Sequence, residues 1–295
     1  MAATAPTRTI GWFLRQGVAA GSVAGVATAL ATLLLVEPPL RAALVIEESR
    51  PTTAGEAAPE LVGRTVQVAG GMVAAVVVGM AVGVVFAVVF AKARHVLPGS
   101  TDLGRSAALA SAGFAVFALL PALKYPANPP GVGDPATVSA RTWMYASLLV
   151  AGVLIAVTAL ALQGSMRRRH RELGPRTVLV ATLIVIATGL VLWAWPATPD
   201  SVPSDVPASL LWQFRVASLG QLAVLWGVLG LGSGLLFDRE GSRARPTGPG
   251  RSVASPVLTP PGGEGSHSGP NQVPGGFRSL LLVVVVSAPM SEFLS

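Results

Sequence analysis

The chain contains no cysteine, which excludes disulfides, thiolate metal sites and thiol redox chemistry. Charged residues are also scarce: they make up only 12% of the 295 residues, against about a quarter in soluble domains. Hydrophobic residues, by contrast, make up 52%, and the mean hydropathy is +0.63. This composition predicts an integral membrane protein.

Several kinds of catalytic and binding motif are missing as well. The only lysines are Lys92 and Lys124, and neither lies in a glycine-rich phosphate loop, so we expect no nucleotide hydrolysis. The histidines, His95, His170 and His267, fall outside the apolar runs, which argues against a histidine metal site inside the membrane. No pairing of a nucleophile with a base is visible. The sequence therefore predicts a protein that is not an enzyme and that holds no permanent cofactor.

Uncharged runs of about 20 residues, enough to cross about 30 Å of hydrocarbon, recur along the chain. They predict an all-α integral membrane protein, a bundle of six transmembrane helices in the cell membrane. The predicted spans are Gly17–Val36, Thr65–Ala91, Ser106–Leu123, Thr142–Gln163, Thr177–Trp195 and Leu210–Phe237.

The placement of lysine and arginine predicts the orientation. These residues concentrate before the first span, between spans two and three, between spans four and five, and after span six, so both termini are predicted to be cytoplasmic. The run Arg167–Arg171 is read as a topology anchor rather than a nucleic-acid site, because no aromatic residues interleave it. The resulting layout is a cytoplasmic segment 1–16, a bundle 17–237 with outer loops 37–64, 124–141 and 196–209, and a disordered tail 238–295 rich in glycine, proline and serine.

Acidic residues show the opposite asymmetry, since most fall in the predicted outer loops. An acidic outer mouth would concentrate cations. Alternatively, acidic residues simply accumulate where basic residues are excluded, and the sequence leaves both explanations open.

The stretch after the first span predicts a short amphipathic helix on the outer surface. Glu37 can begin it, Pro38 and Pro39 fit its first turn, and Leu40, Leu44 and Glu47 would share a face with Glu37. Glu37 and Glu47 would then lie about 15 Å apart, too far to bind one ion together.

Glycines spaced four residues apart predict close helix contacts. Gly17, Gly21 and Gly25 mark one face of the first span, and Gly79 and Gly83 mark a face of the second. Such faces are typical of a compact bundle or of a docking strip for a second membrane subunit, and a homo-oligomer is compatible with either.

The segment Lys124–Arg141 holds prolines at 126, 129, 130 and 135 and glycines at 131 and 133, so it cannot form a regular helix throughout. Its backbone carbonyls could point inward at a hydrated cation, as unwound segments of carriers do. The alternative is a rigid external cap whose Asn128 and Asp134 side chains are tied into turns.

Polar side chains near the outer ends of the spans are the remaining candidates for function. Lys124 and Arg215 either serve a site or extend to the membrane surface, and Gln221 either lines a path or bonds to another helix.

Three stretches resemble one known family. VEPPLRAALVIEE at 36–48, LKYPANPPGVGDPATVSARTWMY at 123–145 and PASLLWQFRVASLGQLAVLW at 207–226 are similar to motifs of the CbtA-type proposed cobalt transporter subunits. The resemblance covers about residues 10–237. It implies a subunit for cobalt uptake linked to cobalamin synthesis, working with a small histidine-bearing membrane partner of the CbtB type.

Two hypotheses follow. In the first, Co²⁺ passes a site of oxygen ligands, and cationic and polar residues pair these ligands or act as a gate. The candidate ligands are Glu37, Glu47, Asn128 and Asp134, and the pairing or gating residues are Lys124, Tyr125, Arg141, Arg215, Ser218 and Gln221. In the second, the chain is a membrane scaffold that transports nothing and docks a partner through its glycine faces.

Overall fold

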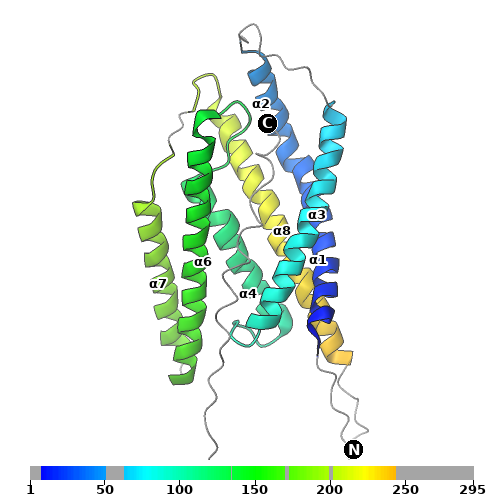
Figure 1. The fold of residues 1–295 in the computed structure, drawn as a ribbon, viewed down its shortest axis with the longest axis vertical. Coiled ribbons are helices and arrows are strands. Elements are labelled where there is room, and N and C mark those ends of the chain that lie inside the picture. Colours follow the sequence, from blue (N-terminus) through cyan, green and yellow to red (C-terminus); the bar gives the residue numbers. More distant parts are fainter. Residues whose placement is uncertain (1–7, 51–62, 134, 170–172, 199–201, 244–295) are drawn as a thin grey trace, which may run out of the picture.

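The computed structural model describes residues 8–50, 63–133, 135–169, 173–198 and 202–243. Its elements are helical: α1 (Ile10–Ala31), η1 (Thr32–Val36), α2 (Glu37–Glu48), α3 (Arg64–Ala93), α4 (Asp102–Phe114), η2 (Ala115–Leu119), α5 (Leu120–Lys124), η3 (Pro135–Thr137), α6 (Val138–Arg169), α7 (Leu173–Ala194) and α8 (Ala208–Arg243). They form one elongated bundle (Figure 1).

Six helices are long and apolar enough to cross a membrane, which confirms the predicted fold class. Their limits are Ile10–Glu48, Arg64–Ala93, Asp102–Lys124, Val138–Met166, Thr177–Ala194 and Ala208–Arg239. The sixth helix does not stop at the predicted boundary, since α8 continues through Asp238 to Arg243. The rest of the predicted tail, 244–295, lies outside the described residues.

The start of α1 and the end of α8 lie at the same end of the bundle (Figure 1). We call this the inner end, because the charge distribution predicts that it faces the cytoplasm. At the other, outer end, Trp143, Trp193 and Trp212 are each at least two-thirds exposed. Exposed tryptophans near the outer ends of several spans are typical of an aromatic belt at the membrane surface.

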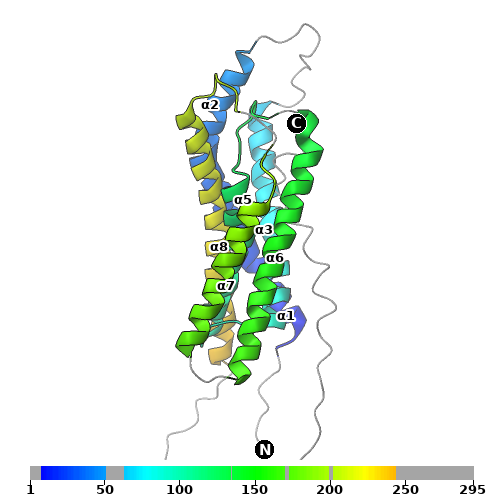
Figure 2. The ribbon, with the colours of Figure 1, turned by 90° about the vertical axis from the view of Figure 1, so that its left-hand side faces the viewer.

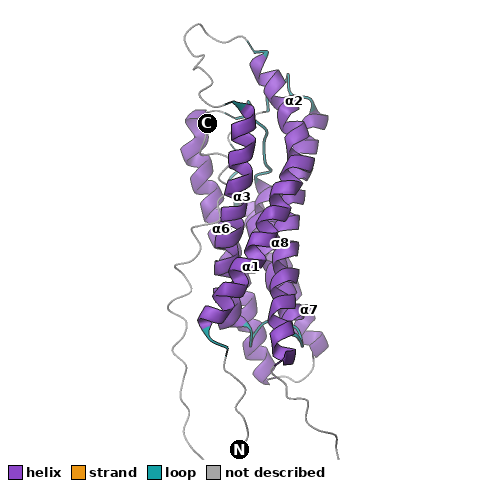
Figure 3. Ribbon diagram, turned by 90° about the vertical axis from the view of Figure 1, so that its right-hand side faces the viewer, coloured by secondary structure: helices purple, strands orange, loops and turns teal. Residues whose placement is uncertain are grey.

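The helices are packed unevenly. α1 packs most extensively against α3, and α8 lies alongside α1 (Figure 3). α8 also packs against α4. α6 and α7 form a separate pair at one side and reach the other helices mainly through η2 and α5 (Figures 1 and 2). The core of the bundle therefore consists of α1, α3, α4 and α8.

Glycines bring α1 and α3 into direct backbone contact. A Cβ added to Gly17 would lie 2.5 Å from the carbonyl oxygen of Gly83, and one added to Gly79 would lie 2.5 Å from the Cα of Gly25. Gly21 lies against the Gly79 carbonyl in the same way. These glycine faces cover each other, so neither is open to a second subunit.

Pro38, Pro39 and Pro121 lie within continuous helices, each just after a π-helical turn. In η1 the Glu37 N–H donates to the Thr32 carbonyl, and in η2 the Leu120 N–H donates to the Ala115 carbonyl, five residues back in both cases. A proline lacks the N–H and its ring clashes with the carbonyl four residues back. The wider π turn makes room for that ring, and the helix continues.

The helix predicted at 37–48 is present as α2, but its predicted placement, lying on the outer surface of the membrane, is wrong. α1, η1 and α2 form a single helix of 39 residues, Ile10–Glu48, rather than a span followed by a helix lying on the membrane. At about 1.5 Å per residue this helix is roughly twice as long as the hydrocarbon is thick. Hence α2 continues the first span beyond the membrane, and Glu37 is buried where η1 passes into α2.

Candidate cation path at the outer end

The proline-rich segment packs between the helices instead of projecting into water. It begins where α5 ends, below the outer ends of α6 and α8 (Figure 2). Pro129 is less than 2% exposed and Val132 is 9% exposed. Gly131 and Gly133 have φ angles of 75° and 119°, which favour glycine. Asp134 lies outside the described residues.

Lys124 and Tyr125 tie the end of α5 to the end of α7. The Lys124 ammonium donates to the Leu192 carbonyl at 2.9 Å, and the Tyr125 hydroxyl donates to the Pro196 carbonyl at 2.7 Å. Burial raises the pKa of Tyr125, so its hydroxyl keeps its proton at neutral pH. Both side chains satisfy carbonyls at a helix end, where helical partners are lacking.

Arg215 of α8 donates to the side-chain oxygen of Asn128 at 3.0 Å. This contact holds the proline-rich segment against α8. The Nε atom of Arg215 is buried and has no hydrogen-bond partner among the described residues. Ser218 lies one turn further along α8 and is half-buried.

Gln221 contacts another helix. Its side-chain oxygen lies 2.6 Å from the hydroxyl of Thr32, which also lies 2.9 Å from the Thr28 carbonyl. The contact joins α8 to the π turn η1. Sequence reasoning identified Gln221 but missed Thr32, because a threonine within an apolar run usually bonds only to its own helix.

Glu37 is the buried carboxylate at this end. It is 7% exposed, and its two oxygens accept from Arg41 and Arg64, each at 2.8 Å. Arg64 belongs to the first turn of α3, so the pair joins α2 to α3. The Arg41 side chain is 68% exposed, whereas that of Arg64 is 36% exposed. Arg41 is thus the partner that can leave the carboxylate most easily.

A third polar contact lies further out, at the end of α2. Arg50 donates to the Gly131 carbonyl at 2.7 Å and to the Asp205 carboxylate at 2.8 Å. Glu47 lies beside the same glycine, since a Cβ added to Gly131 would lie 3.4 Å from the Glu47 Cβ. Arg50 therefore links α2, the proline-rich segment and the connection before α8.

We expect the Arg50–Asp205 contact to weaken in acid. The hydrogen bond that Arg50 donates to Asp205 lowers the pKa of Asp205 below its ordinary value of 3.8, and the same bond raises the pKa of Arg50. A carboxyl whose folded-state pKa is lowered stabilises the fold above its unfolded-state pKa and loses this effect as the pH falls through the folded value. The unfolding temperature, measured between pH 6 and pH 3, should fall less steeply below about pH 4 for Asp205→Asn than for the native chain. Equal slopes would contradict the assignment.

Sequence reasoning overlooked the arginines that hold these oxygens. Arg41, Arg50 and Arg64 lie on the outer side, against the bias of basic residues toward the inner side. Their position on the outer side could have identified them, because an arginine retained among outer acidic residues commonly has a carboxylate or carbonyl partner. Arg141, half-buried in the first turns of α6, belongs to the same group of outer cations.

The predicted site residues thus fall into neighbouring but distinct contacts. Asn128 meets Arg215, Gln221 meets Thr32, and Glu47 lies beside Gly131. Within the described residues, the Glu37 carboxylate accepts hydrogen bonds from Arg41 and Arg64. Within the described part of the chain, no three His, Cys, Asp or Glu residues are close enough to hold a metal ion together.

Comparison with known proteins bears on what this arrangement does. A family model described as "Probable cobalt transporter subunit (CbtA)" matches residues 10–238. The chain belongs to the CbtA family. This family is one of transporters rather than enzymes, and the word subunit in its description implies a partner. The CbtA-family region ends at Asp238, within α8. No curated protein and no solved structure matches the chain.

Proposed function

We propose that the chain is the membrane subunit of a cobalt-uptake system that supplies cobalamin synthesis, and that the outer polar contacts form the start of its cation path. The observation that supports this most is Glu37. Its carboxylate is buried and is compensated by Arg41 and Arg64. Ionisable groups kept among transmembrane helices in this way commonly mark ion pathways, which makes Glu37 the first candidate for a cation ligand.

The arginine contacts suggest how a cation is taken up. A guanidinium and a metal cation compete for the same carboxylate and carbonyl oxygens. The Glu37 oxygens bond to separate arginines, so release of exposed Arg41 frees one oxygen while Arg64 holds the other. Asn128 and the Gly131 carbonyl are held by Arg215 and Arg50 in the same manner. Exchange of Co²⁺ for a guanidinium is therefore the proposed first step.

The ligand set also bears on the partner. Oxygen ligands bind Co²⁺ but discriminate poorly among divalent ions, whereas imidazole binds the later transition metals more strongly. Glu37, Glu47, Asn128 and Asp134 provide only oxygen. A histidine from a small CbtB-type membrane subunit would supply the selectivity that these residues lack.

The function can be tested by flux of labelled cobalt into liposomes that contain the purified chain, with and without its partner. We expect flux above that of protein-free liposomes, at least when the partner is present. Flux at background under both conditions would overturn the proposal and favour a scaffold that transports nothing.

Adjacent carboxylates offer a matched comparison in the same assay. Glu47 lies beside Gly131. Glu48, the next residue on α2, is also exposed and serves as the control. We expect Glu47→Gln to lower cobalt flux by about two- to fivefold, because a carboxylate at the mouth raises the local cation concentration. Glu48→Gln should change it less. Equal effects of the two substitutions would show that Glu47 has no specific place in the path.

A further inference from the structure

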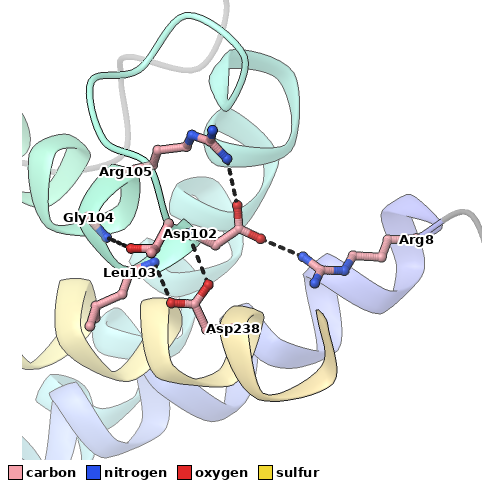
Figure 4. Close-up of polar contacts among 7 residues, drawn as sticks. Arg8, Asp102, Leu103, Gly104, Arg105 and Asp238 are labelled. Carbon is pink, nitrogen blue, oxygen red and sulfur yellow. Dashed lines mark hydrogen bonds and ion pairs between the residues drawn. The ribbon is translucent and has the colours of Figure 1, made fainter. Parts of the chain in front are cut away.

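A second polar cluster lies at the inner end, where α4 begins (Figure 4). The Asp102 carboxylate, whose side chain is 8% exposed, accepts from Arg8 at 2.6 Å and from Arg105 at 3.2 Å. The Asp238 carboxylate accepts from the backbone N–H groups of Asp102 and Leu103 at 3.0 and 3.1 Å. We call Arg8, Asp102, Arg105 and Asp238 the inner clamp. It ties the start of α4 to the segment before α1 and to the end of α8.

The other core helices are joined differently at this end. Trp12, Phe13, Phe90 and Phe237 bring α1, α3 and α8 together in one aromatic cluster, with ring centroids 4.6–6.1 Å apart. From α4, only Leu109 is described as packing against this cluster. The first turn of α4 is therefore held by the inner clamp together with the packing of Leu103 on α8, whereas its three neighbours are joined by the aromatic cluster.

α4 is followed by a place where the helix can bend, because the π turn η2 interrupts the regular hydrogen-bond ladder. At its other end, Gly99 adopts a φ of 128° and lies against Gly104 and Arg105, so the loop before α4 is packed on its first turn. A rigid helix of 13 residues beside such a turn can swing about it and carry that loop along.

Small residues bring α4 and α8 close together near the inner end. Gly230 of α8 lies against Ala110, and Gly234 lies against Leu103. Two serines are completely buried near this interface. The Ser106 hydroxyl donates to the Gly230 carbonyl at 2.9 Å, but the Ser233 Oγ has no hydrogen-bond partner among the described residues. A buried hydroxyl without a partner is destabilising and gains a partner when water reaches it.

We propose that α4 is the inner gate of the transporter, held shut by the inner clamp, and that opening it hydrates the Ser106–Ser233 region between α4 and α8. In the closed arrangement the clamp carboxylates are satisfied and Ser233 is not. In the open arrangement Ser233 is hydrated and the Asp102 contacts are broken. Each arrangement satisfies polar groups that the other leaves without partners, so the interface between α4 and α8 has two alternative states.

The gate also reaches the middle of the bundle. Phe117 lies in η2 and stacks on Trp226 of α8, with ring planes 9° apart and centroids at 5.9 Å. The Trp226 ring lies against Gly113 of α4. A swing of α4 about η2 therefore disturbs the apolar contact that separates the outer polar groups from the inner clamp. As a gate for cobalt, this inference rests on the proposed function.

The absence of cysteine makes the gate directly testable. Ser233→Cys introduces a single, nearly isosteric thiol, which a membrane-impermeant maleimide can label in lipid nanodiscs, where both faces are accessible. We expect slow labelling with the clamp intact and labelling about tenfold faster when Asp102→Asn is added, because loss of a buried ion pair shifts the equilibrium by at least that factor. Asp102→Glu, which keeps the carboxylate, should restore most of the protection.

Two further variants keep the test decisive. Arg8 precedes α1, so Arg8→Gln provides the same comparison if Asp102→Asn impairs folding. Ala24→Cys reports on a fully buried position away from the clamp and should stay unreactive throughout. Unchanged Ser233→Cys labelling in both clamp variants would overturn the gate, and so would a parallel rise at Ala24→Cys, which would show general loosening. Labelling requires no cobalt flux, so failure of the gate and failure of the transport function can be told apart.

Discussion

We expect Gly83→Ala to destabilise the bundle by about 2–3 kcal/mol, the upper part of the range for overpacking. A Cβ at this position would overlap the Gly17 carbonyl oxygen and lie 2.8 Å from the Gly21 Cα. Both neighbours are backbone atoms of a helix, which cannot rotate away as a side chain can. α1 and α3 must then separate along their whole contact. Thermal unfolding in detergent, followed by loss of the folded-protein peak in size-exclusion chromatography, measures the effect.

The same helix provides a matched control for this prediction. Gly71 lies a little more than three turns earlier on α3, and a Cβ added there meets nothing within 4 Å. Alanine is favoured over glycine within a helix by up to about 1 kcal/mol, so Gly71→Ala should be neutral or stabilising. Equal destabilisation by the two substitutions would show that direct contact between α1 and α3 does not determine stability.

The second large effect is expected at Glu37. Glu37→Gln removes the negative charge that pairs with Arg41 and Arg64. The positive charge of Arg64, whose Nε atom is buried, then lacks a nearby negative charge to balance it. We expect a loss of about 2–3 kcal/mol, below the 3–5 kcal/mol typical of fully buried pairs, because Arg41 is mostly exposed and solvent screens its charge. Thermal unfolding of the detergent-solubilised variant measures this loss.

A double-substitution cycle separates the pair from its surroundings. Adding Arg64→Gln to Glu37→Gln removes the partially buried cation as well, so the double variant should regain about half of the lost stability. If the effects of the two single substitutions simply add, Glu37 and Arg64 do not interact energetically, and the described ion pair contributes nothing to the fold.

The transmembrane helices could be predicted from the sequence because each is a long uncharged run. Such runs have few structural alternatives, since a membrane leaves no water for unpaired backbone groups. The path of the chain through Pro38 and Pro39 could not be predicted in this way. Prolines ordinarily end or kink a helix, and the π turn that accommodates them depends on tertiary packing that no local pattern records.

The candidate site was predictable in composition but not in its pairings. The outer position of Glu37, Asn128 and Arg215 follows from the span limits and the loop sequence, and Asn128 and Arg215 do meet. The sequence suggested that Lys124 pairs with a carboxylate, but the structure gives it the Leu192 carbonyl. The inner clamp was missed entirely, because Asp102 and Asp238 are far apart in sequence and each resembles an ordinary helix-end residue.

The central claim is that the Glu37 carboxylate binds cobalt and is not only half of a structural ion pair. It is tested most directly by comparing labelled cobalt flux of Arg64→Gln with that of Glu37→Gln/Arg64→Gln in liposomes, with the partner subunit present and equal amounts of folded protein. The two chains differ only in the carboxylate. We predict measurable flux for Arg64→Gln and flux at the level of protein-free liposomes for the double variant. Equal flux from the two chains would contradict the account.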